Sequence, residues 1–319
     1  MTLAQWSSFW RQGFITTFGA GKAGNYDGIV RKFWVDHFVD LPALSRILDI
    51  ATGNGAIATL AAEISEVHEK NFFVAATDLA EIHSELKANP LALRLRANIH
   101  FHSHTPCERQ PFEDDSFDLV TSQFGFEYSN VEETIREIRR VLAPGGTFIA
   151  ICHHADSRLI EKSREELEVY HSAFDEFDLF GHFKKYLDAV GDLSAPPEKL
   201  ARAMKMARPL SKSINERMDA FRQRHDGEEC AREIVGAISN LAQSARNTEK
   251  SKLMKSIAAA EQEFRFARAR LRDMVRAALD DEQMNTLAVA ARAVGFEAVQ
   301  SLELYGEDDG LAGWQIHIR

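Results

Sequence analysis

The stretch Arg46-Ile47-Leu48-Asp49-Ile50-Ala51-Thr52-Gly53-Asn54-Gly55-Ala56-Ile57-Ala58 decides the fold. It begins as a short apolar run, breaks at an acid followed by small residues, and becomes a helical pattern that continues through Leu60 and Ile64. A buried strand that turns sharply on glycines into a helix is the opening unit of a nucleotide-binding sheet. Gly53 and Gly55 let the backbone approach a ligand closely, and the helix start behind them offers free N–H groups.

The pattern Asp-x-Ala-x-Gly-x-Gly after an apolar strand resembles the first motif of the class I S-adenosylmethionine-dependent methyltransferases. Their usual form has a third glycine where this chain has Ala51. Two other interpretations of the loop alone are a glycine turn without a ligand and a dinucleotide-binding fold, whose third glycine would fall at Ala56 or Ala58. The resemblance implies that S-adenosylmethionine is the cofactor and that its amino-acid end and charged groups meet the loop residues Asp49, Ala51, Gly53 and Gly55.

A second predicted strand, residues 71–78, ends at an acid. An acid at the tip of this strand, about 20 residues beyond the glycine loop, is positioned to accept hydrogen bonds from both ribose hydroxyls. Asp78 matches the acid that follows the first motif in the methyltransferase family. By the same resemblance, Leu79 lies against the adenine face.

The next family motif is altered in this chain. Family members usually continue with Asp-Ala-Glu-x-Leu-Pro-Phe, whose Asp meets the adenine amino group, whereas this chain has Pro106 in place of that Asp. Adenine recognition is therefore expected to pass to Cys107 and Glu108. The following stretch, residues 112–124, resembles the family signature Pro-Phe-x-x-x-Ser-Phe-Asp-x-Val before the fourth strand, and Gln123 lies at the rim where cofactor and acceptor meet.

The N-terminal segment, residues 1–45, has helical patterning and resembles the lid that folds over the cofactor in many class I enzymes. Tyr26, in a Tyr-Asp pair before the second helix, is a candidate for cofactor contact, with packing at a helix start as the alternative. The glycine-rich stretch 19–28 resembles a phosphate loop, but no strand precedes it and no Ser or Thr follows its Gly-Lys pair, so a P-loop is not expected.

The remaining pattern completes an α/β domain. Helices are predicted over 56–67, 82–96, 131–141 and 282–294, and further strands over 97–104, 148–152, 296–304 and 314–318. The predicted fold is a seven-stranded Rossmann-like methyltransferase sheet with a helical N-terminal lid and a large helical insertion after strand five. The predicted domains are a lid over 1–45, a cofactor-binding domain over 46–154 and 281–319, and a helical insertion or cap over 155–280.

The insertion has its own charge pattern. Residues 199–276 carry 18 Lys and Arg against 10 Asp and Glu, in a chain whose net charge is −10. One interpretation is a solvated helical pair with ion pairs such as Glu261 with Arg265. A second is a basic surface for an anionic substrate, such as a phosphorylated lipid, an acidic carrier protein or RNA. The long helices between 231 and 279 also fit a homodimer contact.

Composition limits the class of protein. The 45% hydrophobic content supports a packed core, and no apolar run is long enough to span a membrane. The N-terminus lacks the layout of a signal peptide, and the three cysteines show no CxxC spacing, so a cytoplasmic protein with reduced thiols and no metal site is expected. The net negative charge makes free nucleic acid an unlikely partner.

Methyl transfer depends mainly on positioning, with a base where the nucleophile starts protonated. The Asn/Asp-Pro-Pro-Tyr motif of amide-nitrogen and adenine methylases is missing after strand four, which favours a small-molecule acceptor. His153 and His154, just past strand five, are the predicted catalytic residues, because an unperturbed histidine titrates near the working pH; Glu127 and Tyr128 are further base candidates. Ordinary loop histidines are the alternative.

The sequence therefore predicts an S-adenosylmethionine-dependent methyltransferase that acts on an O, N or C atom of a small-molecule or lipid-like acceptor, which could be anionic. One alternative is a non-catalytic S-adenosylmethionine-binding protein with a regulatory or scaffolding role. Another is an RNA or protein methyltransferase that uses the basic insertion.

Overall fold

The computed structural model describes residues 3–17, 24–83, 90–191, 195–245, 248–306 and 309–319. It divides into two compact units, which are described separately. The sheet unit comprises residues 1–161 and 273–319, and the helical unit comprises residues 162–272. The helical unit is shorter than the predicted insertion, 155–280, because the first turn of α6 (Arg158–His171) and the last turn of α11 (Lys250–Ala277) group with the sheet unit.

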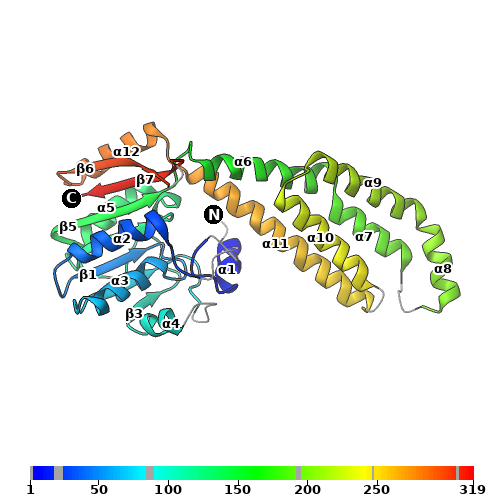
Figure 1. Cartoon of the computed structure of the whole chain (residues 1–319), viewed down its shortest axis with the longest axis horizontal. Helices are drawn as coiled ribbons and strands as arrows, with labels where there is room; N and C mark the ends of the chain where they lie inside the picture. Colours follow the sequence, from blue (N-terminus) through cyan, green and yellow to red (C-terminus); the bar gives the residue numbers. More distant parts are fainter. Residues whose placement is uncertain (1–2, 18–23, 84–89, 192–194, 246–247, 307–308) are drawn as a thin grey trace. The chain divides into compact units, whose positions relative to one another are not determined.

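The sheet unit contains the predicted seven-stranded sheet, with strand order β3-β2-β1-β4-β5-β7-β6 (Figure 1). The strands β1 to β5 are parallel to one another, and β7 is antiparallel to both β5 and β6. The strand bounds are Arg46–Ile50 (β1), Phe73–Thr77 (β2), Ile99–His102 (β3), Phe117–Gln123 (β4), Leu142–Cys152 (β5), Val299–Tyr305 (β6) and Leu311–Ile318 (β7). Because β1 has β2 on one side and β4 on the other, the strand order reverses at β1, and a crevice opens beyond the carboxyl ends of these strands.

Helices cover both faces of the sheet with separate apolar cores. One core packs α2 (Gly28–Asp40), α3 (Ala56–Val67) and α4 (Pro90–Arg96) on β1, β2 and β3. The other core packs α5 (Val131–Val141) and α12 (Asp281–Ala293) on the opposite face. The helix α5 presents Ile135, Ile138 and Val141 to the sheet and begins at the Asn130 side chain, which accepts the Glu133 backbone N–H.

Several element bounds depart from the sequence prediction. The strand β5 begins at Leu142 instead of 148, because Leu142 already pairs with Phe117 before a register shift to the Leu119–Thr147 pair. The helix expected over 82–96 is helical from Pro90; residues 84–89 lie outside the described part of the chain. Residues 19–23, half of the glycine-rich stretch 19–28, also lie outside it.

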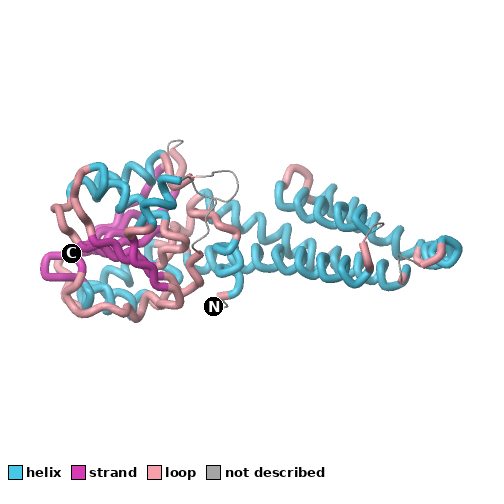
Figure 2. Tube along the Cα trace, turned by 90° about the horizontal axis from the view of Figure 1, so that it is seen from below, coloured by secondary structure: helices cyan, strands magenta, loops and turns pink. Residues whose placement is uncertain are grey.

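The helical unit contains no strand among its described residues, and Figure 2 draws it as helices and loops only. Its helices are α6, α7 (Leu179–Val190), α8 (Pro197–Met206), α9 (Arg208–Arg224), α10 (Glu229–Ser244) and α11. All of these helices except α8 contribute to a core of their own, in which Phe180, Phe221 and Ile234 are fully buried. The predicted ion pair is present: Arg265 Nη2 lies 2.7 Å from Glu261 Oε1. Across the described residues of both units, no helix is long and apolar enough to cross a bilayer.

The two ends of the insertion lie side by side in the sheet unit. The backbone N–H of Ala155 donates to the Leu279 carbonyl, and the Leu279 N–H donates to the His153 carbonyl, both at 2.9 Å. The Trp314 indole N–H on β7 donates to the same Leu279 carbonyl at 2.9 Å. The chain therefore leaves the sheet unit and returns to it at one place beside β5 and β7.

Candidate functional site

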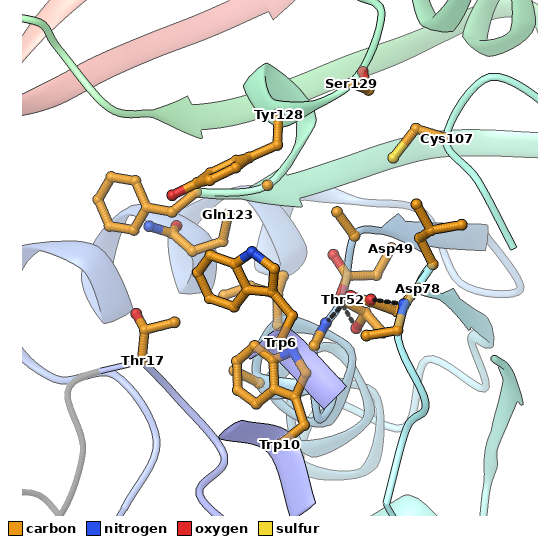
Figure 3. A pocket seen from close by; sticks show the side chains of 18 of the residues that line it. Trp6, Trp10, Thr17, Asp49, Thr52, Asp78, Cys107, Gln123, Tyr128 and Ser129 are labelled. Atoms are coloured by element: carbon orange, nitrogen blue, oxygen red, sulfur yellow. Dashed lines mark hydrogen bonds between the residues drawn. The ribbon is translucent and has the colours of Figure 1, made fainter. Parts of the chain in front are cut away.

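A cavity lies at the point where the strand order reverses, beyond the carboxyl ends of β1, β2 and β4 (Figure 3). The structure brings nearly all of the predicted cofactor residues into its wall: Tyr26, Asp49, Ala51, Gly53, Asp78, Leu79, Cys107, Glu108 and Gln123. Gly55 does not line the cavity. It stands at the N-cap of α3 with a φ of +86°, where an added Cβ would lie 2.7 Å from the Phe101 ring.

The indole ring of Trp10 packs against the glycine loop. Gly53 has a φ of +59°, and a Cβ added there would lie 2.4 Å from the Trp10 side chain. The loop residue Asn54 holds this segment in place, because its side-chain amide donates to the backbone carbonyls of Trp10 and Phe14 at 2.9 and 2.8 Å. Only glycine therefore lets the loop backbone and the N-terminal segment come this close together.

Asp49, at the end of β1, is a buried carboxylate in the cavity wall. Its two oxygens accept the hydroxyl protons of Thr52 and Thr121. Burial raises the pKa of Asp49 to about 7 in spite of these hydrogen bonds. A cation placed in the cavity would stabilise the ionised carboxylate, so this wall favours a positively charged ligand.

Asp78, just past β2, is held by backbone donors. Its Oδ2 accepts the Gly53 N–H and its Oδ1 accepts the Ala80 N–H, each at 2.7 Å. Burial raises the pKa of Asp78 to about 6. The Asp78 carboxylate is thereby fixed against the glycine loop, and Figure 3 shows it beside Thr52 at one end of the cavity.

Gln123, the last residue of β4, carries a side-chain amide whose two ends differ. Its Oε1 accepts the Trp34 indole N–H at 2.6 Å. Its Nε2 is buried and has no hydrogen-bond partner among the described residues. Because a buried amide N–H without a partner is costly, this nitrogen is a ready donor to an oxygen of a bound molecule.

Both residues predicted on the adenine side, Cys107 and Glu108, lie in the cavity wall. Cys107 lines the cavity, and burial raises the pKa of its thiol, so it stays protonated. Glu108 also lines the cavity, but its Oε1 accepts the Asn130 N–H at 2.7 Å, at the start of α5. Tyr26 is buried in the wall, and burial raises the pKa of its hydroxyl.

The structure corrects the direct role predicted for His153 and His154, because neither lines the cavity. His154 is buried against Trp314, with ring centroids 4.4 Å apart. His153 is also buried, which lowers its pKa to about 3, and its Nε2 lies 3.3 Å from the hydroxyl of Tyr128, which does line the cavity. His153 therefore lies behind two residues of the cavity wall: its Nε2 faces the Tyr128 hydroxyl, and its ring packs against Phe124 at 4.4 Å.

Part of the wall was not predicted. The helix α1 (Ala4–Arg11) contributes Trp6 and Trp10, whose rings stack at 6.5 Å, and Trp6 also meets the Tyr128 ring edge-on at 5.6 Å. The i, i+4 spacing of the two tryptophans placed them on one helix face. Nothing in that spacing indicated which cavity the face would cover.

Part of the chain is similar in sequence to known proteins. Residues 48–150 match the family model described as a methyltransferase domain. A ubiquinone/menaquinone biosynthesis C-methyltransferase of Rickettsia massiliae is 31% identical over 152 residues, which is 44% of this chain and 61% of that protein. The enzyme of the same description from Rickettsia bellii is 32% identical over 126 residues, 38% of this chain and 50% of that protein. The chain thus spans less than two thirds of the length of these relatives.

Among solved structures, a SAM-dependent methyltransferase from Aquifex aeolicus has a TM-score of 0.32 and 19% identity, covering 40% of this chain and 66% of that one.

Proposed function

We propose that this chain, whose residues 48–150 belong to the class I S-adenosylmethionine-dependent methyltransferase superfamily, transfers a methyl group from that donor to a small-molecule acceptor. The observation that carries the proposal is the cavity at the strand-order reversal, where Asp49, Gly53 and Asp78 meet in one wall. The matched relatives extend beyond the aligned part, so methyl transfer by the whole chain belongs to this proposal.

The residues present fit the donor. S-adenosylmethionine supplies an electrophilic methyl group on a positively charged sulfur. Gly53 lines the cavity beside the Trp10 ring, where its backbone would meet the amino-acid end of the donor, and the Asp78 carboxylate would accept hydrogen bonds from the ribose hydroxyls. Asp49 faces its cationic groups, which would lower the raised pKa of this buried acid. Gln123 offers its unpartnered Nε2 as a donor.

In the transfer, the protein positions the two reactants and excludes water. Trp6 and Trp10 close the cavity from the side of α1, and Phe124 and Tyr128 form its wall after β4. An apolar, closed site holds two reactants in line and strengthens each polar contact inside it.

For the acceptor, we propose a planar, largely apolar molecule. The support is twofold: the wall is aromatic on both the α1 side and the β4 side, and the similar proteins are named for quinone biosynthesis. Aromatic rings pack well on aromatic side chains.

An anionic acceptor and a homodimer through the helical unit stay predictions. Lys199, Arg202 and Lys205 are exposed on α8, within the basic stretch 199–276. If this stretch takes part in binding an anionic acceptor, that binding should weaken between about 50 and 200 mM salt. The mass in solution tests the dimer.

The deciding experiment is transfer of labelled methyl from S-adenosylmethionine to fractions of a cell lysate, with donor binding measured in parallel by calorimetry. We expect donor binding and label in a small-molecule fraction. Donor binding with no label in any fraction would instead support a regulatory or scaffolding protein. Label in RNA or protein would point to the macromolecular alternative.

A further inference from the structure

Tyr128, His153 and Glu127 form a row of side chains that extends from the cavity wall into the interior of the sheet unit. Tyr128 lines the cavity, and its hydroxyl lies 3.3 Å from His153 Nε2. On the other side of the imidazole, His153 Nδ1 lies 3.5 Å from Glu127 Oε1. Glu127 is held in place because its Oε1 also accepts the backbone N–H of His153 at 2.8 Å.

The carboxylate sets the tautomer of the imidazole. The N–H of a neutral histidine is most stable where it faces an anionic acceptor, so the proton belongs on Nδ1, toward Glu127. Nε2 is then an acceptor and takes the hydroxyl proton of Tyr128. The remaining lone pairs of the Tyr128 oxygen are left to accept a proton from a molecule in the cavity.

The titratable groups with the largest effect on the pKa of Tyr128 are Glu127, Asp273, Tyr26 and Cys152. Burial raises the pKa of Glu127 to about 7 and lowers the pKa of His153. Glu127 Oε2 and His153 Nδ1 have no hydrogen-bond partner among the described residues. Glu127 is therefore the group of this pair that holds a proton near neutral pH, and His153 stays neutral.

We propose that Tyr128, His153 and Glu127 form a proton relay that deprotonates a ring-bound hydroxyl of the methyl acceptor, a phenol or a hydroquinone. This inference rests on the proposed function and adds a substrate class and a proton path to it. Tyr128 is the catalytic residue, because it meets the acceptor; His153 and Glu127 act through it.

In this step the acceptor hydroxyl gives its proton to the Tyr128 oxygen while the Tyr128 proton passes to His153 Nε2. The His153 Nδ1 proton passes in turn to Glu127 Oε1, so the imidazole ends neutral and the Glu127 carboxylate ends protonated. The electron pair released on the acceptor forms the new bond to the methyl carbon, at oxygen or at a conjugated ring carbon. The bond between that methyl carbon and sulfur breaks with its electron pair on sulfur.

The first test needs no ligand. Nitrogen-15 NMR of labelled histidine should show His153 with a protonated Nδ1 and an Nε2 that accepts a hydrogen bond. Tyr128→Phe should remove that bond and shift the Nε2 resonance, and Glu127→Gln should move the proton from Nδ1 to Nε2. Tyr170→Phe, which changes a buried tyrosine in the helical unit, serves as the control. A proton on Nε2 in the unsubstituted protein, or a resonance that ignores Tyr128→Phe, would overturn the relay.

The second test uses 4-nitrophenol, which absorbs visible light when ionised, together with S-adenosylhomocysteine. At a pH below its ordinary pKa, the ratio of ionised to neutral bound nitrophenol should be about tenfold higher in the unsubstituted protein than in Tyr128→Phe, because the relay lowers the pKa of the bound phenol by about one. Equal ionisation in the two proteins would overturn the relay. No saturable binding of nitrophenol would overturn the acceptor class, whereas loss of binding to S-adenosylhomocysteine would count against the proposed function.

Turnover supplies the last readout once an acceptor is found in the lysate assay. Tyr128→Phe should lower kcat by about 10²–10⁴-fold with unchanged donor affinity. Glu127→Gln should remove the rise of kcat with pH near the pKa of Glu127, which a purely structural role would leave in place.

Discussion

At the scale of single residues, Asp78 is a position where a substitution should weaken donor binding without unfolding the protein. Its carboxylate is anchored by two loop N–H groups, so its position does not depend on a ligand. We expect Asp78→Asn to lower the affinity for S-adenosylmethionine by about 10–100-fold, which corresponds to the loss of about 1.5–3 kcal/mol from hydrogen bonds to a charged group. Calorimetric titration measures this affinity.

The matched control for this change is Asp118→Asn. Asp118 also accepts a backbone N–H, that of Arg46 at 2.8 Å, but it lies outside the cavity wall. Equal affinities of the two variants for the donor would contradict the role assigned to Asp78.

A side chain at Gly53 should weaken donor binding. A methyl group on this residue would collide with the Trp10 ring, and the φ of +59° would strain any residue with a Cβ. We expect Gly53→Ala to weaken donor binding more than about tenfold. Gly145→Ala is the control, because Gly145 has a φ of +81° and no atom within 4 Å of an added Cβ. It should carry similar backbone strain and leave donor binding unchanged; equal losses in both variants would attribute the effect to strain alone.

At the scale of elements, α1 depends on a distant acid for its position. The side chains of Gln5 and Trp6 donate to Asp273 Oδ2 at 2.8 and 3.3 Å, near the end of α11. We predict that Asp273→Ala makes the amides of α1 exchange hydrogen at least about tenfold faster and speeds donor release, because α1 loses two side-chain hydrogen bonds that tie it to the rest of the unit. Hydrogen-exchange mass spectrometry checks this, with Asp281→Ala, an exposed acid, as control. Exchange in α1 that stays at the original rate would show that Asp273 does not hold the helix.

The sequence predicted these elements unequally. The bounds of α3 and α5 agree with the predicted 56–67 and 131–141, because a 3.6-residue apolar period and its flanking breaks are local signals. The strand that follows α5 was placed too late, since its pairing partner is remote in sequence. His153 was singled out for its position after a strand. Its burial behind Tyr128 arises from packing between elements, which spacing along the chain does not encode.

At the scale of the molecule, three buried acids make stability depend on pH. Burial raises the pKa of Asp49 to about 7, of Asp78 to about 6 and of Glu127 to about 7, so the folded protein binds more protons than the unfolded chain between about pH 4 and 7. The stability that these groups contribute is complete below their unfolded pKa values and is lost as pH rises through the folded ones. A pKa that is higher by one in the folded state than in the unfolded chain corresponds to about 1.4 kcal/mol of this stability.

We therefore expect the melting temperature of the ligand-free protein to fall between pH 5 and pH 8. Calorimetry at a series of pH values measures it. Asp49→Asn should flatten the slope, because it removes one of the three acids, and saturating S-adenosylmethionine should flatten it too, because its positive charge favours ionised Asp49. A slope in Asp49→Asn as steep as in the unsubstituted protein would show that Asp49 does not titrate in this range.

The sheet unit should fold without the helical unit. The apolar cores of the sheet unit and of the helical unit share no residue among those described, and the insertion starts and ends at the paired backbones of 153–155 and Leu279. Replacing residues 158–277 by a short Gly-Ser linker should therefore leave a sheet unit that unfolds cooperatively and still binds S-adenosylmethionine. Because the shortened protein also lacks Asp273, its donor affinity should match that of full-length Asp273→Ala and not that of the unsubstituted chain. Calorimetric unfolding and titration measure both. A shortened protein without a cooperative transition would show that the helical unit stabilises the sheet, and donor binding far weaker than in Asp273→Ala would show that the helical unit contributes to the site by more than this one carboxylate.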